Sequence, residues 1–128
     1  MPIIQIKALP QKSGLDINKI LKTLTAEVSK ATKIPLNNLW ATWETLTSQL
    51  YIEGETSSSL QPFNSHPPLV NVISFEGKSI DIQEAIMTTV GRVLTRELQI
   101  DQGNCFIVYD EVKAGKVFVG GEILRGKN

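Results

Sequence analysis

The sequence predicts an α+β fold, a two-layer α/β sandwich in which two helices cover one face of a four-stranded mixed sheet. Three observations support this fold class: the chain repeats itself, each repeat has the pattern of a strand, a helix and a second strand, and a polar segment joins the halves. We expect a single domain over residues 1–128, with βαβ repeats at 2–54 and 68–121 and a linker at 55–67.

The repeat is visible when its two halves are aligned at their prolines. PIIQIKALPQKSG begins at Pro2 and PLVNVISFEGKSI begins at Pro68, so that proline matches proline and Lys-Ser matches Lys-Ser. The offset of 66 residues from Pro2 to Pro68 continues without a gap and pairs Trp40 with Phe106. Because the match keeps its register through a whole unit, we interpret the chain as a tandem duplication.

Each repeat begins with a strand and continues into a helix. The first strands are expected at 3–9 and 69–75, which are short and rich in β-branched residues. Ser13 and Ser79 are candidate amino-terminal caps of the helices that follow. Apolar residues then recur with the helical period, so each helix has one face to bury. They are Ile17, Ile20, Leu21, Leu24, Val28 and Ala31 in the first helix, and Ile82, Ile86, Val90, Val93, Leu94 and Leu98 in the second.

The second strands of the repeats are expected at 39–46 and 105–112. A strand-helix-strand crossover makes the two strands of a repeat parallel. KVFVGGEI at 116–123 is expected to add a short strand, as is its counterpart LYIEGE at 50–55. Helices on one face leave the other face of the sheet open, and apolar side chains there predict an interface in a symmetric homo-oligomer.

Composition excludes several classes of protein. Thirteen basic residues balance thirteen acidic ones, which argues against nucleic acid as a partner. The apolar runs are far shorter than the roughly 20 residues of a membrane span, and the amino terminus lacks a signal peptide pattern, so we expect a cytoplasmic protein without a membrane partner. Cys105 is expected to be a buried thiol, and His66 has no partner with which to bind a metal. We expect neither metal nor cofactor.

Several short motifs together resemble the tautomerase superfamily, typified by 4-oxalocrotonate tautomerase. They are the Met-Pro start, the basic residue Lys12, FEGKS at 75–79 and GGE at 120–122. The duplicated chain is similar to the fused members of that superfamily, such as malonate semialdehyde decarboxylase, cis-3-chloroacrylic acid dehalogenase and macrophage migration inhibitory factor. In these, three chains form a trimer, so the resemblance implies a homotrimer.

The resemblance implies that Pro2 is the catalyst, because members of the family lose the initiator methionine and use the exposed prolyl amine. A secondary amine among apolar neighbours and near a cation has a lowered pKa, and it can then act as general base and acid. Pro68 cannot do so because its nitrogen is an amide within the chain. The chemistry at Pro2 likewise requires that Met1 be removed.

Further site residues follow from the same resemblance. Lys12 falls on the position of a substrate-binding arginine, and Lys78 is its repeat counterpart; solvated turn lysines are the alternative interpretation. Trp40 and its counterpart Phe106 replace a second arginine, which favours a monoacid or an aromatic enol over a dicarboxylate held at both ends. Packing in the core or between chains is the alternative role for Trp40. Tyr51 falls on the apolar aromatic residue of the family's site.

Three functions are therefore considered. The leading hypothesis is a tautomerase or isomerase that catalyses keto-enol chemistry, by 1,3- or 1,5-proton transfer, on a small 2-oxo or enol carboxylic acid. The first alternative is a hydratase or dehalogenase of 3-substituted acrylates with Glu53 as a water-activating residue, although Leu9 replaces an arginine of that group. Asn38 and Ser29 replace the decarboxylase aspartate and the cis-dehalogenase histidine. The other alternative is a catalytically inactive trimeric binding or structural protein.

Overall fold

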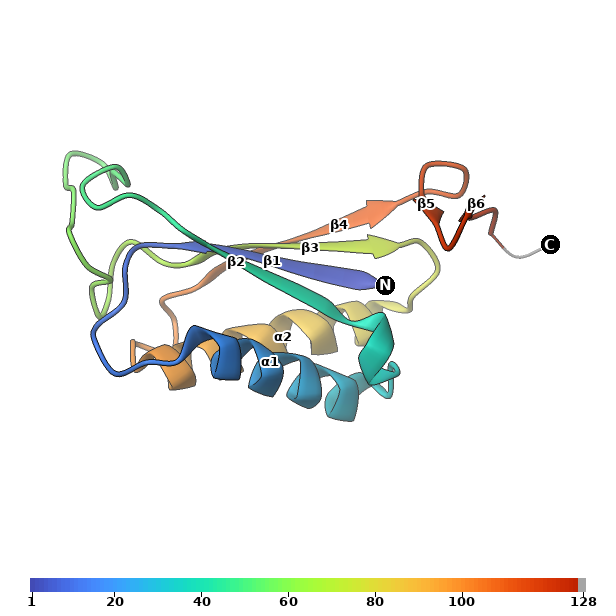
Figure 1. Ribbon diagram of the computed structural model, residues 1–128, viewed down its shortest axis with the longest axis horizontal. Helices are drawn as coiled ribbons and strands as arrows, with labels where there is room; N and C mark the ends of the chain where they lie inside the picture. Colours follow the sequence, from blue (N-terminus) through green and yellow to red (C-terminus); the bar gives the residue numbers. More distant parts are fainter. Residues whose placement is uncertain (127–128) are drawn as a thin grey trace.

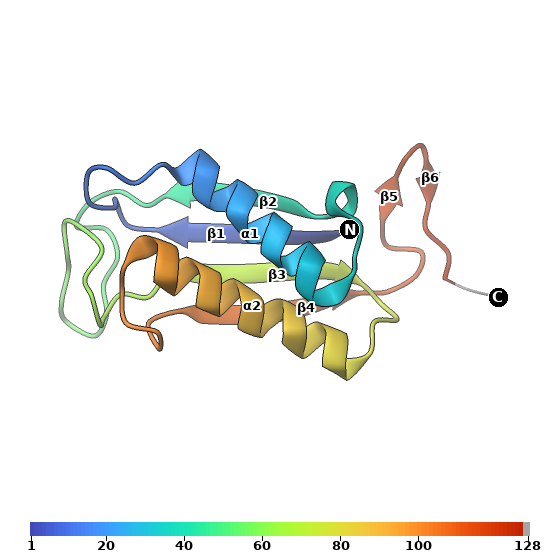
Figure 2. The same cartoon turned by 90° about the horizontal axis from the view of Figure 1, so that it is seen from below.

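Two helices and a four-stranded sheet make up most of the structure, a computed structural model that describes residues 1–126 (Figure 1). The elements in order are β1 (Pro2–Ala8), α1 (Ile17–Thr32), a 3₁₀ turn η1 (Leu36–Asn38), β2 (Trp40–Thr45), β3 (Leu69–Phe75), α2 (Ile80–Leu98), β4 (Phe106–Val112), β5 (Phe118–Val119) and β6 (Glu122–Ile123). Figure 2 shows both helices on the same face of the sheet. The predicted fold class is confirmed.

The strand order is β2-β1-β3-β4. Within each repeat the strands are parallel, as predicted from the crossover, whereas β1 and β3 join the repeats in antiparallel pairing. Consequently the start of β1 lies beside the end of β3, and equivalent positions of the two repeats fall at opposite ends of the sheet.

The core lies between the sheet and the helices. Alternate residues of the central strands and one face of each helix are buried. The buried apolar side chains include Ile4, Ile6, Leu24, Val28, Val70, Val72, Ile86, Val90, Val93 and Leu94. Each fully buried aliphatic side chain contributes about 1.5–3 kcal/mol. A slip of one residue would turn these side chains to the open face, so their burial also fixes the register of the strands.

The predicted helix cap is confirmed in the second repeat and is wrong in the first. Ser79 accepts a hydrogen bond from the backbone N–H of Ile82 at 3.2 Å and caps α2 as predicted. The prediction for Ser13 is wrong, because Asp16 caps α1 by accepting from the N–H of Lys19 at 3.1 Å. A carboxylate closer to the first helical turn satisfies its free N–H groups, so α1 starts later than the repeat predicts.

The predicted terminal strand forms as a hairpin of β5 and β6. Gly120 and Gly121 turn the chain there with φ of 63° and 85°, a region that favours glycine. At the counterpart position the structure has only an isolated bridge between Glu53 and Thr56. The β5/β6 hairpin projects from one end of the sheet (Figure 1).

Side-chain hydrogen bonds order the polar linker. His66 is 1% exposed, its Nε2 donates to the Thr56 carbonyl at 2.8 Å, and its Nδ1 accepts from the Ser65 hydroxyl at 3.0 Å. The side-chain amide of Asn104 donates to three linker carbonyls, including that of Ser65 at 2.9 Å. His66 is therefore a buried structural residue, and residues 1–126 contain no group of three metal-ligating side chains.

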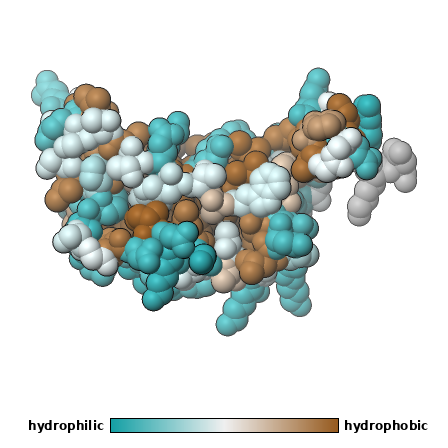
Figure 3. All heavy atoms as spheres, in the orientation of Figure 1, coloured by the Kyte–Doolittle hydropathy of each residue, from teal (hydrophilic) through white to brown (hydrophobic). Residues whose placement is uncertain are grey.

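The face of the sheet away from the helices exposes large apolar residues, as predicted. Trp40 is 45% exposed, Leu69 37%, Phe106 55% and Val108 40%, whereas Trp43 packs against the core on the other side. Figure 3 shows this upper surface hollowed between two projecting ends, each of which carries hydrophobic residues. An interface between copies of the chain would cover these side chains.

Candidate active site

Pro2 lies at the start of β1, where it pairs with Ser74 at the end of β3. The residue is less than 2% exposed and its ring is on the helix-facing side of the sheet. Burial lowers the pKa of the chain's amino group at Met1, and the positive charge of Lys78 lowers it further. Because a residue advances a strand by only about 3.3 Å, removal of Met1 would leave the new amine of Pro2 in the same partly desolvated environment.

Lys78 lies in the turn between β3 and α2, and it is half-buried. Burial lowers the pKa of its ammonium group, and the negative charge of Glu111 on β4 opposes that shift. The lysine thus brings a poorly solvated positive charge close to the amino terminus, where it can attract an anion.

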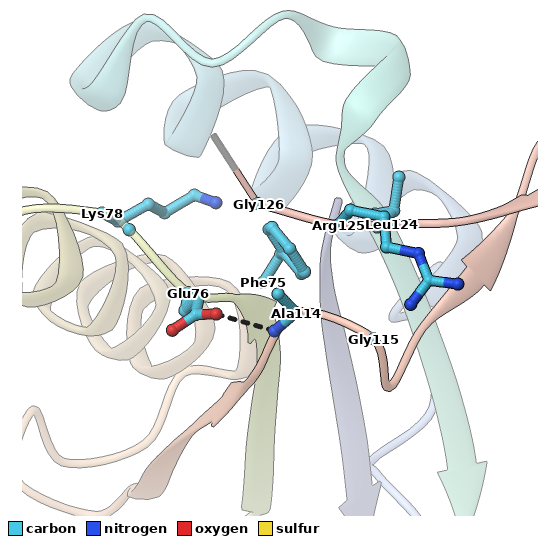
Figure 4. A pocket seen from close by; sticks show the side chains of 9 residues that line it. Phe75, Glu76, Lys78, Ala114, Gly115, Leu124, Arg125 and Gly126 are labelled. Atoms are coloured by element: carbon cyan, nitrogen blue, oxygen red, sulfur yellow. Dashed lines mark hydrogen bonds between the residues drawn. The ribbon is translucent and has the colours of Figure 1, made fainter. Parts of the chain in front are cut away.

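A cavity of about 880 Å³ opens next to this lysine. Its walls come from the turn after β3 and from the segments on either side of the β5/β6 hairpin. Figure 4 shows Lys78 on one side of the cavity, Arg125 on the other, and Phe75 between them. Glu76 accepts a hydrogen bond from the backbone N–H of Ala114 at 2.7 Å, which fixes the turn to the chain after β4 (Figure 4).

Arg125 is a cavity residue that the sequence analysis did not identify. It follows the GGE hairpin closely, and its guanidinium lies within 3.9 Å of the position a Cβ would take at Gly115. In the sequence, Arg125 is only a basic residue next to a predicted turn. Such residues are common, so Arg125 could be assigned to a site only once the position of the hairpin was known.

Three of the predicted site residues lie at the Pro2 end of the sheet. Besides Pro2 and Lys78, Trp40 is paired with Ile3 in the register of β1 and β2. Its side chain is on the open face of the sheet, whereas Pro2 faces the helices. Within one chain, Trp40 is therefore a neighbour of the amino terminus but on the other side of the sheet.

Lys12 and Tyr51 lie at the opposite end. The Lys12 ammonium is exposed and donates a hydrogen bond to the side chain of Gln99, the residue that caps the carboxyl end of α2. The Tyr51 hydroxyl donates to the Pro67 carbonyl at 2.7 Å, so it fastens the linker to the start of the second repeat. One chain does not bring either side chain to Pro2.

Phe106 and Glu53 also lie at that distant end. Phe106 is paired with Leu69 in the register of β3 and β4, and its side chain is on the open face. Glu53 accepts a hydrogen bond from the backbone N–H of His66 at 2.9 Å, which engages one of its carboxylate oxygens in holding the linker. These residues can reach a Pro2 site only if a neighbouring copy of the chain supplies them.

Cys105 does not have the properties of a nucleophile. Burial raises the pKa of its thiol to about 11, so the thiol is protonated at neutral pH. The expectation of a buried thiol is met in part, because Cys105 is partly buried and packs against the core. No helix within residues 1–126 is long and apolar enough to cross a membrane.

Comparison with known proteins identifies the fold. No family model matches the sequence, and no curated protein sequence matches it. Among solved structures, a protein inactivated by 2-oxo-3-pentynoate matches with a TM-score of 0.81 and 15% identity over 95% of this chain and 94% of that one. A fused 4-OT, a symmetric trimer, matches with a TM-score of 0.79 and 15% identity over the same 95% and 94%.

A third similar structure is malonate semialdehyde decarboxylase, which has decarboxylase and hydratase activities. It matches with a TM-score of 0.68 and 15% identity over 92% of this chain and 90% of that one. The chain therefore shares the fold of these proteins, and the resemblance is confirmed for the fold alone. The low identity leaves the activity to be argued from the residues of the site.

Proposed function

We propose that this protein is a tautomerase that transfers a proton between carbon and oxygen in a small 2-oxo or enol carboxylic acid. The catalyst is the amine of Pro2 after removal of Met1. The observation that carries the proposal is the position of Lys78, a half-buried cation that lines a cavity of about 880 Å³ and whose charge acts on the amino terminus.

The proton transfer needs an amine that is neutral near the working pH. Burial and the field of Lys78 both lower the pKa of the amino group at this place, which favours the neutral base. The Pro2 nitrogen takes a proton from the substrate and becomes an ammonium. It then returns a proton to a different atom of the enol or dienol intermediate, so the amine is regenerated and no proton is gained or lost.

Lys78 supplies the positive charge that such a reaction needs. Its ammonium holds the substrate carboxylate or stabilises the negative charge that develops on the enolate oxygen. A lysine provides a point charge without the two-pronged geometry of arginine, so it fixes the orientation of a carboxylate less strictly. Lys12, the first candidate from the sequence, takes this role only if a neighbouring copy brings it to the cavity.

We propose that the working form is a homotrimer. The exposed apolar face of the sheet supports an interface, and the similar fused 4-OT is a trimer. In this arrangement, Trp40, Tyr51 and Phe106 form walls of the pocket by packing between copies. No cofactor takes part in the proposed reaction.

The decisive assay compares three proteins whose amino termini have been verified by intact mass. The purified chain without Met1 is expected to ketonise phenylenolpyruvate or 2-hydroxymuconate, and Pro2→Ala is expected to lose at least about two orders of magnitude in rate, the contribution typical of a general base. Pro68→Ala is the matched control and is expected to stay active, because that nitrogen is an amide. Equal rates for the chain and Pro2→Ala would refute the proposal.

Hydration of a 3-substituted acrylate is the second candidate, favoured by the structural similarity to a decarboxylase with hydratase activity. In that reaction a protonated Pro2 would act as the acid, and Glu53 of a neighbouring copy would direct water. If the Glu53→Gln variant hydrates the substrate at an unchanged rate, Glu53 does not take part in the mechanism. If the protein from its natural host retains Met1, both reactions are impossible and a binding or structural role remains.

A further inference from the structure

Two buried hydroxyl groups near Pro2 have no hydrogen-bond partner. Ser74 is 0% exposed, and neither its Oγ nor the hydroxyl oxygen of Tyr109 is satisfied within the part of the chain that the structure describes. Ser74 is the register partner of Pro2, and both residues point toward the helices. Tyr109 stands on β4 beside Val72, on the same side of the sheet.

Such pairs of unsatisfied groups are rare, because removing a hydroxyl from water without a new partner is unfavourable. The first repeat does not contain them. The counterpart of Ser74 is Ala8, which is also 0% exposed. The counterpart of Tyr109 is Trp43, whose indole N–H donates to the Thr45 hydroxyl at 3.2 Å. The polar substitutions occur only in the repeat whose strand end adjoins the amino terminus.

We propose that Ser74, supported by Tyr109, is a positioning residue that accepts a hydrogen bond from the Pro2 amine. This inference rests on the proposed function, because it requires removal of Met1. With Met1 attached, the Pro2 nitrogen is an amide without hydrogen and has nothing to donate to Ser74. Once freed and protonated, the same nitrogen carries two hydrogens, and one of them satisfies the Ser74 oxygen.

The hydrogen bond between Pro2 and Ser74 is strongest when the Pro2 amine is protonated, which is the state formed during the reaction. When the amine takes a proton from the substrate it becomes a cation, and a hydrogen bond to a charged donor is about twice as strong as a neutral one. Ser74 accepts from the ammonium and donates its own hydrogen to the Tyr109 oxygen, so its lone pairs stay turned toward Pro2. The two hydroxyls do not form a hydrogen bond in this structure, yet Ser74 is close enough to Tyr109 to oppose the rise that burial causes in the Tyr109 pKa.

Lys78 acts on the amino group at this end of the sheet, and further charged or titratable groups stand on the surrounding elements. Lys78 and Glu76 come from the turn after β3, Tyr109 and Glu111 from β4, and Arg125 from the carboxyl-terminal segment, while Lys30 of α1, Lys33 at its end and Asp81 of α2 are exposed. Burial and the charge of Lys78 lower the pKa of the amino group at Met1, and we expect both to act in the same direction on the Pro2 amine. Ser74 acts in the opposite direction, because a hydrogen bond to the charged form stabilises that form.

The test is a titration of the Pro2 amine in the processed protein, labelled with ¹⁵N-proline and followed by NMR. Ser74→Ala is expected to lower the amine pKa by about one unit, the size of one hydrogen bond to a charged group. The acid limb of the kcat/KM profile is expected to move to lower pH by the same amount, and kcat to fall about tenfold at unchanged KM. Tyr109→Phe is expected to act in the same direction with a smaller effect.

The repeat supplies a matched control. Ala8→Ser places a hydroxyl at the counterpart position, at the other end of the sheet, and is expected to leave the amine pKa unchanged while lowering the thermal stability. If Ser74 has only a structural role, Ser74→Ala is expected to keep or raise the thermal stability and to leave the pKa of the Pro2 amine unchanged. If both Ser74→Ala and Tyr109→Phe leave the amine pKa unchanged, the inference is wrong.

The titration uses no substrate, so it separates this inference from the proposed function. If the enzyme is active but the pKa of its Pro2 amine is the same in Ser74→Ala, only the positioning role of Ser74 is overturned. A processed protein without activity would overturn the tautomerase proposal, and a shifted amine in Ser74→Ala would then still support the contact between Ser74 and Pro2.

Discussion

Lys12 and Lys78 occupy equivalent positions in the two repeats, yet they lie at opposite ends of the sheet. The cause is the antiparallel pairing of β1 with β3, which turns one repeat around relative to the other. Lys78 is half-buried and its charge acts on the amino terminus. Lys12 is exposed and bonds to Gln99. The duplication therefore supplies two lysines, and the fold gives only one of them a place near Pro2 within a chain.

We expect the two lysines to differ as catalytic residues. Lys78→Ala is expected to lower kcat/KM for a carboxylate substrate by about 10- to 100-fold, the value of a hydrogen bond to a charged group, mainly through a higher KM. Lys12→Ala is its matched control and is expected to change kcat/KM by less than about twofold, as surface charges commonly do. Steady-state kinetics with phenylenolpyruvate measures both. A greater loss in Lys12→Ala would show that the site is completed by a neighbouring copy.

The duplication made most of the fold predictable from the sequence. The strand at 69–75 agrees with the structure, and so do the apolar faces of both helices except at Ala31, which is exposed. Burial that recurs with the period of a strand or helix can be predicted from the order of residues alone. The cap at Ser13 was wrong because two capping residues, Ser13 and Asp16, precede α1. Which of them satisfies the first helical turn depends on the path of the connecting loop, which a local pattern does not contain.

The site was less predictable than the fold, because it depends on contacts between distant segments. The family resemblance assigned Lys12 and Tyr51 to the site of Pro2, but Pro2 begins β1 whereas both of these residues lie beyond its other end. Arg125 enters the cavity because the hairpin folds back over the turn at Glu76, a long-range contact. Proximity of this kind follows from register and packing, neither of which a periodic pattern determines.

The bond between Glu76 and Ala114 predicts a variant with a local effect. Glu76→Ala removes the acceptor of a partly buried N–H, so the free energy of unfolding is expected to fall by about 1–3 kcal/mol. Hydrogen exchange is expected to accelerate at residues 113–126, the part of the chain that this bond fixes. Glu76→Gln keeps an oxygen acceptor and should lose less than half as much. Unchanged exchange at Ala114 in Glu76→Ala would show that the bond does not hold this segment.

His66 offers a test of the linker at the other end of the molecule. Its ring makes two hydrogen bonds and packs edge-on against Tyr51 at a centroid distance of 5.1 Å. His66→Ala leaves a cavity and an unpaired carbonyl, so the free energy of unfolding in urea is expected to fall by about 3 kcal/mol. Catalysis at Pro2 is expected to persist below the lowered melting temperature.

The control for His66 is Ser65→Ala, which removes a single hydrogen bond to the ring and should cost about 1 kcal/mol. If His66→Ala proves no less stable than Ser65→Ala, the linker is not held by the buried ring. Added zinc is expected to leave the stability of the parent protein unchanged, since the described residues contain no group of three metal-ligating side chains.

Glu27 of α1 joins the two helices by ion pairs with Arg92 and Arg96 of α2, at 3.0 and 2.5 Å. Hydrogen bonds from Arg96 and then Arg92 lower the pKa of Glu27 from 4.5 to about 2. A carboxyl group with a lowered pKa in the folded state contributes stability above its unfolded pKa, and this contribution is lost as the pH falls toward the folded value. The pairs are at the surface, so their contribution is small.

Glu27→Gln is therefore expected to lower the free energy of unfolding by about 1 kcal/mol at pH 7 and low salt. The difference from the parent protein should shrink as the pH falls below about 4.5 and vanish only below about pH 2, where the parent carboxyl group becomes protonated in both states. Urea titrations at pH 7, 4 and 2 measure this. Glu97→Gln, which touches only Arg96 on its own helix, is the control and should change less. A difference that stays constant down to pH 2 would mean that Glu27 acts through packing, since about half of the charge pairing is lost at that pH.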